Sequence, residues 1–362
     1  LLGIRGVLCD MGECGTSLCL SFRLVDDPFK ERRDQQQKRD GKMEGELDLL
    51  RSVNLFTRGS PYDVRCVVPI GNNRVLCLTF HPASDQSPLD TLQCWVCLVG
   101  QDSVDIEESF PCPLPPNMQS PTYTRVGSHV CVFGAISSEY GSDLWVLSLD
   151  TLKWRQVTKP AQSAFGRLIR REWPGERTHH LAMCVGDRLV ITGGWVGTWI
   201  GSRHLRDCWA YDPDTDAWTR LPNCPANLTS GCTVPMGDGE TVMMLGCGGE
   251  DSDYDSYTPR SAAYTFSLDG GFVSLGSHER TSYCSVASRT GRYVFVTGGK
   301  YLQRKVSVLD TVSMDWLSDF SCETPGRLSR GLFCMCSPDT GVCWSNQGEI
   351  HLMDMYVDQD VD

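Results

Sequence analysis

The chain has 362 residues, of which 41% are hydrophobic and 22% charged, and its formal net charge is −12. This balance is typical of a globular protein, and the acidic charge argues against a nucleic-acid binder, which needs a basic surface for phosphate contacts. No stretch reaches the roughly eighteen consecutive apolar residues of a membrane-spanning helix, so a membrane partner is not expected either.

The first 50 residues divide into two parts. Residues 5–24 contain short apolar runs that predict two strands. Residues 26–48 are rich in charged residues and Gln and contain few apolar side chains, so they predict a disordered, solvated insertion within the first structural unit. The chain does not begin with a basic segment and a long apolar core, and a secretory signal peptide is therefore not expected.

From residue 71 onward one pattern recurs along the chain. An apolar run that ends at or near a diglycine is followed by a loop, a second apolar run, a polar turn and often a Trp. The first runs end at residues 80, 135, 194, 249 and 299, which are 55, 59, 55 and 50 residues apart. A further short apolar run precedes each diglycine run, so each repeat predicts four strands. This period and strand count predict a β-propeller with one four-stranded blade per repeat.

The repeated residues have structural explanations. Glycine tolerates the crowding and the sharp turn that are expected where inner strands approach the propeller axis. A Trp on an outer strand, such as Trp218, would fill the wedge between adjacent blades, and Phe272 takes this place in one repeat. The structural diglycines are Gly193, Gly194, Gly248, Gly249, Gly298 and Gly299.

These features resemble the kelch repeat. The resemblance is carried by the diglycine, by "YDPDTDAW" at residues 211–218, and by an Arg that opens a unit, as Arg177 and Arg280 do. It extends over residues 62–320 and implies an all-β, kelch-type β-propeller; we expect a single propeller domain over residues 1–362. Counting the strands at the two chain ends separately gives seven blades, the number we favour, whereas merging them into one closing blade gives six.

The 19 cysteines occur mainly in the apolar runs. Disulfide networks are typical of short secreted chains with Cys at loop positions, so we expect reduced, buried thiols and a cytoplasmic protein. Cys94 and Cys97 have the spacing of a zinc or redox pair, but residues three apart on a strand point to opposite faces.

The resemblance implies that partner proteins bind to loops at one mouth of the propeller. Two long loops, 159–177 and 195–207, flank the same blade, and between Arg167 and Arg206 there are seven Arg against three acidic residues. Trp and Arg are enriched at binding hot spots, and Arg grips carboxylates well. The residues predicted to bind a protein or acidic peptide are Arg167, Arg170, Arg171, Trp173, Arg177, Trp195, Trp199, Arg203, His204 and Arg206.

Two of these residues have a structural alternative. Trp195 and Arg177 also belong to the repeat pattern, in which they would face neighbouring blades. The loop at residues 250–260 is acidic, but it lacks the Gly and the distant Glu of a calcium loop, so a solvated loop is the better interpretation.

The sequence therefore predicts a protein-interaction module, an adaptor or scaffold, with no cofactor, metal site or catalytic residue. The alternative is a copper- or iron-dependent enzyme of the galactose-oxidase-like or specifier type on the same fold. His81 and His204 lie in the loops such a site would use, but no other spacing supports a shared ion.

Overall fold

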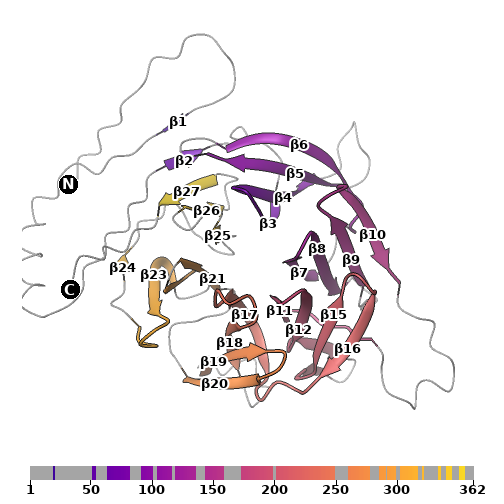
Figure 1. The fold of residues 1–362 in the computed structure, drawn as a ribbon, viewed down its shortest axis with the longest axis vertical. Helices are drawn as coiled ribbons and strands as arrows, with labels where there is room; N and C mark the ends of the chain where they lie inside the picture. The colour runs from indigo at the N-terminus through magenta and orange to yellow at the C-terminus, as the bar shows by residue number, and fades with distance from the viewer. Residues whose placement is uncertain are drawn as a thin grey trace, which may run out of the picture.

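The computed structural model describes residues 19–20, 51–53, 63–81, 91–100, 104–115, 119–135, 143–158, 173–198, 201–248, 260–277, 285–290, 292–298, 302–316, 320–321, 333–335, 340–344 and 350–354. The regular elements in these ranges are strands, and they contain no helix long and apolar enough to cross a bilayer. Figure 1 shows the strands as sheets arranged in a ring around a central opening. The predicted insertion at residues 26–48 lies outside the described residues.

Five sheets are antiparallel and contain four strands in chain order, as predicted for blades. Blade 1 contains β3 (Asp63–Gly71), β4 (Arg74–His81), β5 (Thr91–Val99) and β6 (Val104–Cys112). Blade 2 contains β7 (Gln119–Val126), β8 (His129–Ala135), β9 (Asp143–Ser148) and β10 (Lys153–Val157). Blade 3 contains β11 (Leu181–Val185), β12 (Arg188–Thr192), β15 (Cys208–Asp212) and β16 (Ala217–Leu221).

Two further blades follow in the same order. Blade 4 contains β17 (Leu228–Pro235), β18 (Val242–Gly248), β19 (Arg260–Ser267) and β20 (Gly271–Ser277). Blade 5 contains β21 (Ser285–Thr290), β22 (Tyr293–Gly298), β23 (Leu302–Asp310) and β24 (Phe320–Ser321). The predicted diglycines thus follow or end the second strand of blades 3, 4 and 5, although Gly249 and Gly299 lie outside the described residues.

The last sheet joins the two ends of the chain. Its strands are β1 (Cys19–Leu20), β2 (Arg51–Val53), β27 (Ile350–Asp354), β26 (Thr340–Trp344) and β25 (Phe333–Met335), in that order. The innermost strands β3, β7, β11, β17, β21 and β25 contact one another in succession, and β25 contacts β3, so the ring closes. The described residues therefore form six blade sheets, the smaller of the two predicted numbers, because strands from both chain ends share one sheet.

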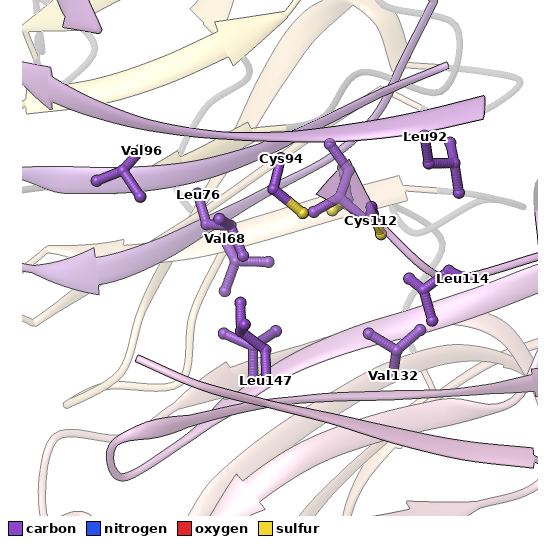
Figure 2. Packing of buried hydrophobic residues seen from close by; sticks show 12 residues of the cluster. Val68, Leu76, Leu92, Cys94, Val96, Cys112, Leu114, Val132 and Leu147 are labelled. Atoms are coloured by element: carbon purple, nitrogen blue, oxygen red, sulfur yellow. The ribbon is translucent and has the colours of Figure 1, made fainter. Parts of the chain in front are cut away.

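The hydrophobic cores lie between adjacent blades. Figure 2 shows the core between blades 1 and 2, in which Leu76 and Cys94 of blade 1 belong to one buried cluster with Val132 and Leu147 of blade 2. Between blades 2 and 3, the ring of Trp218 packs edge-on against Phe133 of blade 2 at 5.7 Å between centroids. The prediction that Trp fills the wedge between blades is confirmed here, and Phe272 takes the same place between blades 3 and 4.

The described cysteines behave as small hydrophobic residues. The ten whose side chains the structure describes are thiols and not disulfides, and most are buried, including Cys94 and Cys112 in the core between blades 1 and 2. Burial raises the pKa of Cys131 and of Cys208 to about 12, so both are neutral thiols at physiological pH.

We expect mild reductant to leave the thermal midpoint of the native protein unchanged. The denatured protein should then titrate with close to its 19 thiols in a chromogenic assay. A fall of many degrees on reduction would instead show that disulfides stabilise the fold.

Candidate partner-binding face

Blade 3 carries an extra hairpin between its second and third strands. After β12 and the diglycine, β13 (Trp195–Thr198) pairs with β14 (Gly201–His204), with Trp195 opposite His204 and Thr198 opposite Gly201. Leu181, the first residue of β11, pairs with Thr192 at the end of β12, so the hairpin lies where the innermost strands begin. We call residues 195–204 the blade 3 hairpin and this end of the propeller the hairpin face.

The diglycine before the hairpin requires glycine at both positions. Gly193 has φ +70° and Gly194 has φ +81°, in the left-handed region that side chains disfavour. A Cβ at Gly193 would overlap the backbone carbonyl oxygen of Leu228, and one at Gly194 would lie 2.6 Å from the carbonyl oxygen of Thr178. At both positions a side chain would therefore be strained and would clash with the backbone.

Backbone hydrogen bonds hold the base of the hairpin. The N–H of Trp195 donates to the carbonyl of Thr178 at 3.0 Å, and the N–H of Thr178 donates back at 2.9 Å. The N–H of Leu205 donates to Gly194, and the N–H of Gly194 donates to Leu228 of the next blade, both at 2.8 Å. These bonds fix the direction in which the hairpin leaves the blade.

Arg177 stabilises the same base and is not a surface residue. Its side chain is completely buried, and Nη2 lies 2.6 Å from Oδ2 of Asp207, the residue before β15. Nη1 donates to the carbonyl of Gly193 at 3.3 Å, and the indole N–H of Trp209 donates to the same Asp207 oxygen at 2.7 Å. The prediction that Arg177 binds a partner is therefore wrong, because its guanidinium binds Asp207 and the Gly193 carbonyl inside blade 3.

Asp207 remains ionised in this setting. Burial by itself would raise the pKa of its carboxyl, but the hydrogen bond and charge of Arg177, together with the Trp209 hydrogen bond, lower the pKa below its usual value.

Trp173 is also buried, so its predicted role in partner binding is wrong. It is 5% exposed and packs in the core between blades 2 and 3, with its ring 5.8 Å from that of Trp218. An aromatic side chain just before the blade-opening Arg177 covers apolar surface that would otherwise face water.

The remaining described residues of the predicted site lie at or near the surface. Trp195 is half-buried, and its ring stacks on that of His179 at 5.9 Å and 15°. Arg203 is exposed and His204 is partly buried. Arg206 is exposed, but its guanidinium donates to the carbonyls of Cys224 and Pro225. Arg167, Arg170, Arg171 and Trp199, as well as the acidic loop at 250–259, lie outside the described residues.

Three residues around the central channel have a strained backbone. Ser120, His179 and Ser230 have φ values of +43°, +55° and +51°. They lie two residues before Thr122, Leu181 and Cys232, which pair with the second strand of blades 2, 3 and 4. The same position is therefore strained in these three blades. Such conformations cost about 1–3 kcal/mol each and cluster at functional sites.

No sequence pattern predicted a role for Ser120 or Ser230, because the repeats share no residue type at this position. Only the backbone geometry relates them to His179.

Two histidines connect the channel mouth to the hairpin. Nε2 of His179 lies 3.4 Å from Oγ of Ser120, while its ring stacks on Trp195. Nε2 of His180 lies 2.8 Å from Oγ1 of Thr122 in blade 2. Burial, followed by the positive charges of Arg177 and His179, lowers the pKa of His180 to about 3, so this imidazole is neutral. His180 is the buried member of the pair.

Within the described ranges, no three His, Cys, Asp or Glu side chains lie close enough together to hold a metal ion. His81 hydrogen-bonds to the hydroxyl of Thr79 at 2.9 Å in its own strand.

A closed ring of antiparallel sheets, five of them four-stranded, around a channel defines a β-propeller. The predicted repeat has three features: a glycine turn, a Trp between blades and an Arg that opens the blade. Blade 3 has all three at the predicted positions. Comparison with known proteins agrees: the model of the kelch motif matches residues 176–225, which contain blade 3 and its hairpin. The chain therefore folds as a β-propeller, and its blade 3 contains a kelch motif.

Two curated relatives share part of the sequence. The mouse protein Kelch domain-containing protein 9 is 33% identical over 134 residues, which are 35% of this chain and 33% of that protein. Human Host cell factor 1 is 34% identical over 89 residues, which are 23% of this chain and 4% of that protein. The similarity thus covers no more than about a third of either relative.

Among solved structures, that of YjhT superposes with a TM-score of 0.50 at 15% identity, over 66% of this chain and 82% of that one. At this identity the likeness shows a shared fold only.

Proposed function

We propose that this propeller is a protein-interaction module that binds a partner protein or acidic peptide at its hairpin face, as an adaptor or scaffold, with no catalytic step and no cofactor. The observation that carries the proposal is the blade 3 hairpin, which is fixed at its base by the Thr178–Trp195 bonds and by the buried Arg177–Asp207 pair. A rigid, projecting element binds with little loss of conformational entropy.

The residue types around the hairpin support an acidic partner. Arg203 is exposed on β14, and two residues, Trp199 and Ile200, connect the paired residues Thr198 and Gly201. The preceding loop adds Arg167, Arg170 and Arg171, so a basic segment lies within a chain of net charge −12. Arg and Trp are the residue types that dominate binding energies at interfaces.

We propose that residues 1–362 form one propeller domain in the cytoplasm, with neither nucleic acid nor membrane as partner. The reduced, mostly buried thiols of the described cysteines support a reducing compartment. The acidic net charge supports a protein partner over nucleic acid.

We expect Arg170→Glu with Arg171→Glu to abolish partner capture, and Arg203→Glu to weaken it by at least about thirtyfold, the scale of a hot-spot residue. Charge reversal places anions where an acidic partner would dock. Trp199→Ala should weaken the same interaction through lost apolar contact. The measurement is affinity capture with each variant, followed by titration of the captured partner against the purified propeller at increasing salt, where binding should fall.

Matched controls have the same charge changes elsewhere. Lys38→Glu with Arg39→Glu, in the 26–48 segment, matches the double variant, and Lys153→Glu, exposed on the outer strand β10, matches Arg203→Glu. These controls should bind like the wild type. If the Arg variants and Trp199→Ala bind normally while changes in the 250–260 loop remove binding, the proposed face is wrong.

A further inference from the structure

A hollow of about 230 Å³ lies beside the channel, next to the strained residues. It is bordered by the innermost strands of four successive units, β3, β7, β11 and β17, and by His180 just before β11. Its volume corresponds to about eight waters at roughly 30 Å³ each. It lies below the roughly 300–1,000 Å³ of pockets for drug-sized molecules, so it suits a small molecule or a single side chain.

Hydroxyl groups from different blades converge on this hollow. Thr122 and Thr124 come from β7, and Thr233 comes from β17. The hydroxyls of Thr122 and Thr233 donate to the carbonyls of Phe133 and Ala182, at 3.3 Å and 3.0 Å. The side chain of Thr124 makes no hydrogen bond within the described part of the protein, so its hydroxyl is available both to donate and to accept.

The rest of the described lining is mostly apolar and carries no charge. Val67, Leu181 and Ala182 contribute aliphatic surface, Cys66 and Cys232 contribute sulfur, and Tyr123 contributes a phenol. The one imidazole in the lining, that of His180, is neutral, and the nearby guanidinium of Arg177 is neutralised by Asp207. An ion entering the hollow would lose part of its hydration without meeting an opposite charge in the described lining, which is costly.

Two of the strained residues lie close in sequence to residues that line the hollow. Ser120 lies two residues before Thr122, and Ser230 directly precedes Gly231, another lining residue. Strained positions of this kind occur at ligand clamps, where the surrounding structure holds them.

From these observations we infer that the hollow is a binding site for an uncharged carboxamide or hydroxyl group of a few non-hydrogen atoms, held by Thr124 and the neighbouring Thr hydroxyls against the aliphatic wall. The group has two possible sources: a free small molecule, or the side chain of a bound polypeptide. The inference does not depend on the proposed binding at the hairpin, because its test uses no partner protein.

The test uses isosteric probes that differ in charge. Propanamide is compared with propanoate, and N-acetyl-glutamine-amide with N-acetyl-glutamate-amide, by NMR of protein labelled at Thr, Val and Ala methyl groups. We expect saturable shifts at Thr124, Thr233 and Ala182 with the amides, and affinity at least about tenfold weaker for the carboxylates. Propanamide binding as tightly as the capped glutamine indicates a free ligand, whereas binding of the capped glutamine alone indicates a polypeptide side chain.

Thr124→Val keeps the side-chain shape and removes the free hydroxyl, so amide affinity should fall about three- to tenfold with an unchanged thermal midpoint. Thr219→Val, an exposed Thr on β16, is the matched control and should bind like the wild type. The inference is overturned if no probe gives saturable shifts, which would mean that the hollow holds water only. It is also overturned if amides and carboxylates bind equally, or if Thr124→Val and Thr219→Val behave alike.

Discussion

Gly193→Val is expected to destabilise the protein by at least about 3 kcal/mol and to prevent stable folding of blade 3. The backbone of Gly193 is left-handed, and any Cβ there would overlap the carbonyl oxygen of Leu228, which is backbone and cannot rotate away. The measurement is the free energy of unfolding by chemical denaturation. By its place in the repeat, Gly298→Val should have a similar effect.

The matched control separates the clash from the backbone strain. Gly239 also has a left-handed backbone, with φ +76°, but a Cβ at this position meets nothing within 4 Å. Gly239→Val should therefore cost only the conformational strain, roughly 1–2 kcal/mol. Equal losses in the two variants would show that the close approach of Gly193 to blade 4 does not exist.

Asp207→Ala is expected to destabilise the protein by about 3–5 kcal/mol, because it leaves the guanidinium of Arg177 buried without its counter-charge. The side chain of Arg177 has no solvent exposure, so water cannot replace the carboxylate. Trp209 would lose its hydrogen-bond acceptor in the same variant. Denaturant unfolding checks the loss.

An exposed aspartate provides the control for this second result. Asp214 lies at the surface in the turn between β15 and β16, and Asp214→Ala should change the free energy of unfolding by less than about 0.5 kcal/mol. If Asp207→Ala were equally mild, the Arg177–Asp207 pair would not stabilise the hairpin base.

The repeat made much of the fold predictable. Each blade packs against its neighbours in the same way. Glycine turns such as Gly193–Gly194 and wedge aromatics such as Trp218 therefore recur along the chain at a regular period. The blade-opening Arg177 was identified by the same pattern. Its assignment to partner binding failed because spacing does not reveal that Asp207, thirty residues later, neutralises it inside the blade.

The other features depend on contacts between segments distant in sequence. Trp173 lies in a long basic loop by sequence, yet Trp218 and the wall of blade 2 bury it. The strained residues Ser120, His179 and Ser230 share a backbone conformation but no residue type. The number of blade sheets depended on whether the strands of the two chain ends pair with each other, which no local pattern specifies.

Hydrogen–deuterium exchange of the propeller with and without its captured partner tests the proposed binding face most directly. Binding at the hairpin face should slow exchange in residues 195–204 and in the loop at 159–177, and should leave the opposite turns at 71–74 and 186–187 unchanged. Protection confined to those opposite turns, or to the outer strands, with no change in the blade 3 hairpin, would contradict the account.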